Sequence, residues 1–143
     1  MFENILSGHE LGYLTRLLFS LFAGFVIGYE RVSRGKAAGV STHSFVIAGS
    51  MTFAFVSFLA DPNSPARIAA QIVTGVGFLG AGIILKMEEG KIVNLTTAAS
   101  IWYAAALGMM IGFGWYVTSL LATLFAVLVP RIPHMPGKDH SQE

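Results

Sequence analysis

Apolar residues fill five stretches of the chain, and short polar segments separate them. The stretches are residues 11–29, 44–59, 68–85, 97–111 and 115–129. Helices of these lengths would be roughly 22 to 28 Å long at about 1.5 Å per residue, against about 30 Å for the hydrocarbon core of a bilayer. None of the five carries the polar face at helical period that a soluble surface helix needs. The pattern therefore predicts an all-α, polytopic membrane protein, a bundle of about five transmembrane helices.

The amino-acid composition also indicates a lipid environment. The 143 residues are 54% hydrophobic and only 12% charged, with a mean hydropathy of +0.65, whereas soluble domains are about a quarter charged. A net charge of +1 provides no basic field for nucleic acid, so no nucleic-acid partner is expected. Cysteine is absent, which excludes disulfides and thiolate chemistry.

The basic residues predict an orientation. With five spans, seven loop or tail cations fall on one side of the membrane: Arg31, Arg34, Lys36, Lys86, Lys91, Arg131 and Lys138. Only Arg67 falls in a loop on the other side, and Arg16 lies inside the first stretch, where we expect it to extend outward towards water. The positive-inside rule then places the N-terminus outside and the C-terminus in the cytoplasm. We expect a transmembrane domain over residues 1–130 and a short disordered cytoplasmic tail over 131–143.

Small residues recur at the four-residue spacing that lets transmembrane helices approach closely. Gly24 and Gly28 in the first stretch, and Ala104 and Gly108 in the fourth, are predicted to lie at helix contacts. The third stretch carries a denser set: Gly75, Gly77, Gly80 and Gly82. Tight packing is the favoured explanation of this set, and a broken helix that lines a site is the alternative. A dinucleotide fingerprint in this set is rejected, because it lacks the preceding strand and the later acidic residue.

Polar residues descend one face of the third stretch from the outer surface, namely Arg67, Gln71 and Thr74. One interpretation is a polar vestibule with Asp61 at its mouth. The other is a structural network in which Arg67 pairs with Asp61 and Gln71 joins two helices. Both predict that Arg67 and Gln71 point into the bundle.

A second group of polar residues marks helix ends on the predicted cytoplasmic side: Glu30, Arg31, Thr42, His43, Thr96 and Thr97. Ser41 or Thr42 is predicted to cap the second helix, and Thr96 the fourth. His43 is expected at the interface rather than as a ligand. No catalytic set, metal site or cofactor site is predicted, so the chain is not expected to be an enzyme.

Five segments together resemble the MgtC/SapB family of bacterial membrane proteins. They are IGYER (27–31), AGVSTH (38–43), RIAAQIV (67–73), GVGFLGAGII (75–84) and LTTAASIW (95–102). The resemblance implies a five-helix domain of the bacterial inner membrane, linked to growth in low magnesium and, in pathogens, to virulence through survival in macrophages. Many members continue into a cytoplasmic domain, and we expect only the transmembrane domain here. Ser41 stands where the family often has arginine, and Tyr103 near where some members have cysteine.

Two functional hypotheses follow from the resemblance and the residues. The first is a regulator that acts by helix-to-helix contact with a membrane complex, the ATP synthase being the target that the family suggests, and that forms homo-oligomers. The alternative is a transporter or channel component for magnesium or another small solute, based on the glycine-rich third stretch. A divalent-cation path normally presents acidic or carbonyl oxygens. The five apolar stretches contain no Asp or Glu, which favours the regulator.

Overall fold

The computed structural model describes residues 7–64, 66–84 and 94–132. Five α-helices form the fold: α1 (Glu10–Ser33), α2 (Val40–Ala60), α3 (Ala66–Ile84), α4 (Leu95–Gly112) and α5 (Tyr116–Leu128). A 3₁₀ turn, η1 (Val129–Arg131), follows α5. The described part of the chain contains no strand, so the predicted all-α class is confirmed.

Four of these helices, α1 to α4, are long and apolar enough to cross a membrane. The fifth is shorter: α5 has 13 residues, or about 20 Å of helix. The five predicted helices are present, and four have a full spanning length. The predicted orientation of the termini is not tested by these lengths, and most of the predicted tail, residues 133–143, lies outside the described residues.

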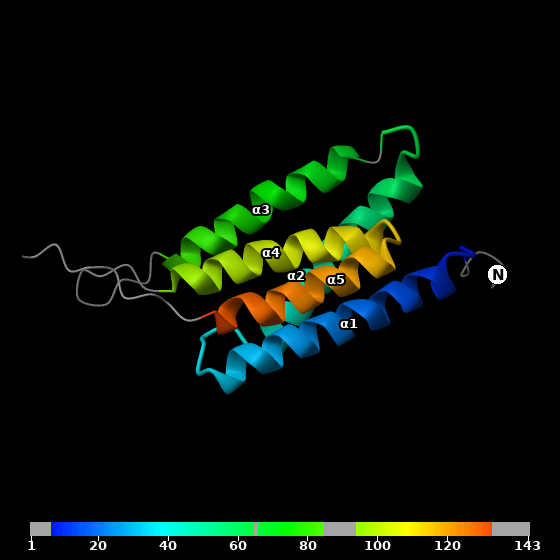
Figure 1. The fold of residues 1–143 in the computed structure, drawn as a ribbon. Coiled ribbons are helices and arrows are strands. Elements are labelled where there is room, and N and C mark those ends of the chain that lie inside the picture. The colour runs from blue at the N-terminus through cyan, green and yellow to red at the C-terminus, as the bar shows by residue number, and fades with distance from the viewer. Residues whose placement is uncertain (1–6, 65, 85–93, 133–143) are drawn as a thin grey trace, which may run out of the picture.

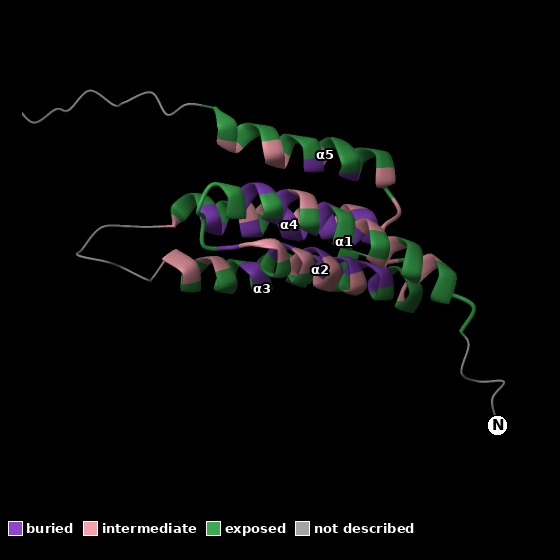
Figure 2. Cartoon of the chain, turned by 90° about the horizontal axis from the view of Figure 1, so that it is seen from below, coloured by how far each residue is buried: buried purple, intermediate pink, exposed green. Residues whose placement is uncertain are grey.

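The helices run side by side as a bundle, with α1 and α3 at opposite edges (Figure 1). Figure 2 shows α5 lying over α1 and α4, on the face away from α2 and α3. The fully buried apolar residues come from the centre of the bundle, where α2 and α4 meet: Ile47, Met51, Ala54, Ala104 and Leu107. The core is therefore built around the α2–α4 contact.

Three of the predicted packing glycines lie where two helices touch. A Cβ atom on Gly24 would lie 2.5 Å from the Cα of Ser44, and one on Gly28 would lie 2.3 Å from the Cα of Val40. A Cβ on Gly108 would lie 2.3 Å from the carbonyl oxygen of Ile47. Such distances are too short for any side chain, so glycine sets the spacing of α2 from both α1 and α4.

The glycines of α3 have different surroundings. Gly75, Gly77 and Gly82 would each carry a Cβ with no neighbouring heavy atom within 4 Å, and at Gly80 the nearest, the Cβ of Ala98, is 4.0 Å away. The buried residues of α3 are only Ala69, Ile72 and Val76. Packing inside one chain therefore does not account for the glycines of α3.

An arginine side chain, that of Arg16, ties the start of α1 to the end of α4. Arg16 extends towards the start of α1, where its Nε donates to the carbonyl of Gly112 (3.0 Å) and its Nη1 to that of Gly12 (3.0 Å). The guanidinium of Arg16 also stacks on Phe55, 4.8 Å from the ring centroid. Arg16 thus extends in the predicted direction and also bonds the C-terminal end of α4, where a cation is favourable.

Candidate functional site

A cluster of buried polar side chains lies at the end of the bundle where α1 ends and α2 and α4 begin. Arg31 is 1% exposed and its Nη2 donates to the hydroxyl of Thr97 at 2.6 Å. Glu30 is 4% exposed and His43 is fully buried. Both Glu30 and Arg31 lie close enough to His43 to act on it electrostatically. Four of the six residues predicted at this end therefore come together in one buried cluster.

The close approach of α1 to α2 creates this burial. Gly28 contacts the backbone at Gly39 and Val40, so the last turns of α1 lie directly against the start of α2. The sequence pattern ended the first helix at residue 29, but α1 continues to Ser33. Because of those extra residues, Glu30 and Arg31 are inside a packed helix and not in a loop.

The predicted helix caps are corrected by the structure. The N-cap of α2 is Gly39 and that of α4 is Asn94, and neither makes a side-chain cap hydrogen bond. Thr42 and Thr96 are exposed residues in the first turns. His43 bonds instead through Nδ1 to the carbonyl of Gly39 at 3.0 Å. The polar residues at these helix starts divide into a buried set and an exposed set, which spacing alone did not separate.

Several atoms of the cluster lack hydrogen-bond partners among the described residues. They are Glu30 Oε2, Arg31 Nε, His43 Nε2 and Ser44 Oγ. The ion pair in this part of the structure joins Glu30 to Arg34 at 3.4 Å, and Arg34 also donates to the carbonyl of Pro130. Buried polar atoms in proteins are nearly always bonded, so the cluster has capacity to bind a further group.

A pocket of about 180 Å³ opens beside Arg31, between α1, α4 and α5. Its polar lining comes from Thr96, Ser100 and Tyr103, and its apolar lining includes Ile27 and Phe125. The Tyr103 hydroxyl donates to the carbonyl of Ala122 at 3.2 Å. From the sequence, Ser100 was interpreted as a packing residue, because it begins the four-residue spacing of small residues that continues with Ala104 and Gly108.

The polar face of α3 does not point into the bundle as predicted. Arg67, Gln71 and Thr74 are all exposed. Asp61 accepts from the backbone N–H of Ser64 at 3.1 Å, and no ion pair joins it to Arg67 among the described residues. The reason is that α3 buries Ala69, Ile72 and Val76 against its neighbours, which turns the polar face outward.

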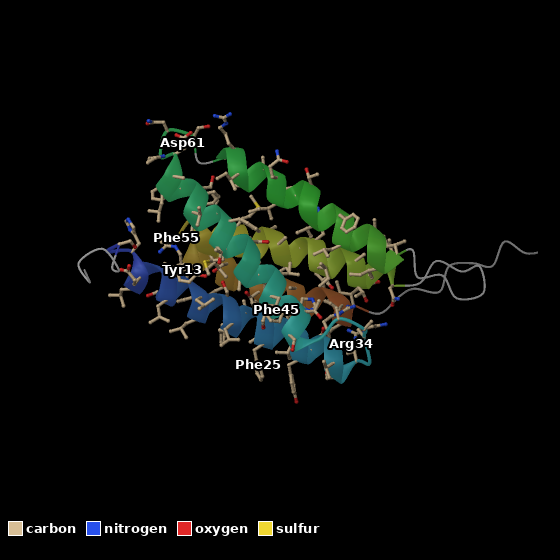
Figure 3. All side chains as sticks on the ribbon, turned by 180° about the vertical axis from the view of Figure 1, so that it is seen from behind. Tyr13, Phe25, Arg34, Phe45, Phe55 and Asp61 are labelled. Atoms are coloured by element: carbon tan, nitrogen blue, oxygen red, sulfur yellow. The ribbon has the colours of Figure 1, made fainter. Side chains whose placement is uncertain are left out.

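Gln71 lines a second hollow. It is a groove of about 510 Å³ between α2 and α3, lined mostly by apolar side chains and by Gly49, Gln71 and Gly75. Phe45, on the α2 wall, is labelled in Figure 3. Figure 3 also places Asp61 and Arg34 at opposite ends of the bundle. The groove and the Arg31 pocket share no lining residue and are separate features.

Neither hollow has the donor set of a metal site. In the described ranges, no group of three or more His, Asp and Glu side chains could hold a metal ion. The acidic pair Glu88 and Glu89, between α3 and α4, lies outside the described residues.

The MgtC family profile matches residues 17–134, from the middle of α1 to beyond η1. The chain belongs to the MgtC family. Its magnesium-related relatives include YhiD of Escherichia coli (strain K12), named as a candidate magnesium transporter, which is 45% identical over 131 residues. That match covers 85% of this chain and 60% of YhiD. Protein MgtC of Salmonella typhimurium (strain LT2) is 42% identical over 112 residues, 78% of this chain and 48% of that protein.

The family membership confirms the predicted resemblance and a magnesium-related, multi-pass membrane protein. Protein MgtC of Brucella abortus (strain 2308) is a further relative, 45% identical over 107 residues, which cover 74% of this chain and 44% of that protein. The chain thus spans about half the length of the curated relatives it matches. No solved structure matches it.

Proposed function

We propose that this protein is a non-enzymatic regulator of the bacterial inner membrane, active under magnesium limitation, that docks onto a helix of another membrane complex through the α2–α3 groove. The proposal takes the regulatory role from the family resemblance, and virulence is its expected consequence in a pathogen. The ATP synthase is the partner complex suggested by the family.

The observation that carries the proposal is the open, glycine-lined groove of α3 with an amide beside it. Gly49 and Gly75 line the groove, and neither would bring a Cβ within 4 Å of a neighbour. Glycine in a helix interior costs about 1 kcal/mol relative to alanine. Close packing of two helix backbones, which only small residues allow, offsets that cost at helix interfaces in membranes. Gln71 is exposed at the same groove, and an amide in lipid is stabilised by a hydrogen bond to another helix.

A photo-crosslinking residue in place of Phe78, the most exposed large hydrophobic residue of α3 at 81%, tests the proposal in bacterial membranes. We expect a crosslink to a subunit of a membrane complex. The Gly75→Leu variant should remove that crosslink, because its side chain would fill the groove. The matched control is Gly77→Leu, which faces the other hollow of α3, between α3 and α4. Crosslinks to lipid alone would contradict the proposal, and a crosslink to a second copy would identify the groove as a homo-oligomer contact.

The alternative function is transport of magnesium or another small solute, favoured by the name of the relative YhiD. Reconstitution in proteoliposomes loaded with a magnesium-sensitive dye separates the two functions. The regulator predicts no protein-dependent dye signal when magnesium is added outside. A signal that grows with the amount of protein, and that Gly75→Leu abolishes, would instead support transport.

A further inference from the structure

Arg31 is a buried cation that forms no ion pair among the described residues, although the Glu30 carboxylate is near enough to act on it electrostatically. It is 1% exposed, and its hydrogen bond goes to a neutral hydroxyl, that of Thr97 at 2.6 Å. The carboxylate beside it in sequence, Glu30, pairs with Arg34 instead. No carboxylate of the described residues lies within 4.0 Å of the Arg31 guanidinium, and its Nε has no partner. Because a buried charge left unpaired is strongly unfavourable, this geometry calls for a negatively charged group.

The pocket beside Arg31 has two kinds of wall. Arg31 and the hydroxyl-bearing residues Thr96, Ser100 and Tyr103 form the polar part. The remainder is apolar and comes largely from α5 and the turn after it: Phe125, Ala126, Val129 and Pro130. A guanidinium at one end and an apolar wall along a surface helix suit a molecule that carries an anionic head on a hydrocarbon chain.

We propose that this pocket binds a phosphate group, with the phosphate on Arg31 and, when a lipid supplies it, the acyl chain along α5. A guanidinium forms paired hydrogen bonds to phosphate; Arg31 lines the pocket, and its Nε has no partner among the described residues. At about 180 Å³, the pocket holds a head group and the start of one chain. It lies at the opposite end of the bundle from Arg67 and apart from the α2–α3 groove, so it stands independently of the regulatory role.

Thermal unfolding of the full chain in a neutral maltoside detergent tests this. We expect phosphatidylglycerol to raise the melting temperature in a concentration-dependent way, and diacylglycerol with the same chains to leave it unchanged. Inorganic phosphate distinguishes the source: a shift with phosphate and none with the lipid would place free phosphate on Arg31. Equal shifts with phosphatidylglycerol and diacylglycerol, or no shift with any of the three probes, would overturn the proposal.

Variants separate the pocket from general attraction to anions. Arg31→Gln should weaken phosphatidylglycerol binding at least tenfold. Ala126→Leu keeps Arg31 and fills the pocket, so it should weaken the lipid's binding similarly if the unliganded protein still unfolds cooperatively. Arg67→Gln removes the same charge at the other end of the bundle and should bind like the wild type. The proposal fails if Arg67→Gln loses as much affinity as Arg31→Gln, or if Ala126→Leu, folded, binds unchanged.

Discussion

Two sets of glycines in the apolar helices of this chain have opposite structural settings. Gly24, Gly28 and Gly108 each face backbone of a neighbouring helix at distances that no side chain could occupy. Gly75 and Gly77 on α3 face open space. The small-residue pattern thus marks a surface made for close approach, but it does not say whether the approaching helix belongs to the same chain. On α1 and α4 the approaching helix belongs to the same chain, whereas no described residue contacts α3 at Gly75 or Gly77.

The largest expected effect comes from filling a closed contact. Gly108→Leu must displace the α2 backbone at Ile47, since even a Cβ would lie 2.3 Å from its carbonyl oxygen. We expect a loss of unfolding free energy towards the upper end of about 1–3 kcal/mol, measured by denaturant unfolding of the purified protein in detergent. The matched control is Gly77→Leu, which meets open space and should unfold like the wild type. Equal losses in the two variants would remove the distinction between the two glycine sets.

A smaller loss of stability is expected from replacing an arginine, and it should differ between Arg16, which bonds a neighbouring helix, and Arg67, which is exposed. Arg16→Met leaves the Gly112 carbonyl without its charged donor, and we expect a loss of about 1.5 kcal/mol, since hydrogen bonds to charged groups contribute roughly 1.5–3 kcal/mol. Arg67→Met removes an exposed side chain with no ion pair among the described residues and should change stability little. Detergent unfolding curves of the two variants, compared with the wild type, measure the difference. A greater loss for Arg67→Met would mean that the Arg67 side chain, and not only the buried face of α3, holds α3 to the bundle.

The smallest change in stability is expected at Gln71. Gln71→Leu should alter the unfolding free energy of the isolated protein by less than about 0.5 kcal/mol, because the side chain is exposed in the single chain and such surface substitutions are usually neutral. The same variant should reduce the crosslink from position 78, since the partner helix loses a hydrogen-bonding group. Loss of stability together with an unchanged crosslink would assign Gln71 a purely structural role.

The sequence was sufficient to predict where the helices lie, but not which face of each helix is buried. Apolar length predicted five helices and placed the ends of all five within four residues, because a lipid environment leaves the backbone little choice but helix. It did not predict that Arg67 and Gln71 point outward. In water a polar face marks the outside of a helix, but in a membrane it can face the bundle, a partner or the head groups. The burial of Ala69 and Ile72 settled that choice, and this depends on the position of α2 and α4.

The candidate site at the other end was half predictable. Glu30, Arg31, His43 and Thr97 were singled out as residues of a helix-end motif, but their burial was not foreseen. Charged residues next to an apolar run normally mark its boundary, so the helix was ended too early. Burial here depends on Gly28 contacting α2, a long-range contact whose partner is not identified by helical spacing. The pocket needs α5 as a third wall, and nothing local to Arg31 indicates that.

The arginine links of α1 also bear on how the protein is made. Arg16 bonds Gly112 and Arg34 bonds Pro130, and each link spans 96 residues. When α1 first enters the membrane, neither partner has been synthesised, and Arg16 has only the Gly12 carbonyl of its own helix. A cation at that depth extends towards the interface until a better partner arrives. The α1–α2 contact can therefore form early, but the two arginine bonds of α1 and its C-cap must wait until Gly112 and Pro130 have been made.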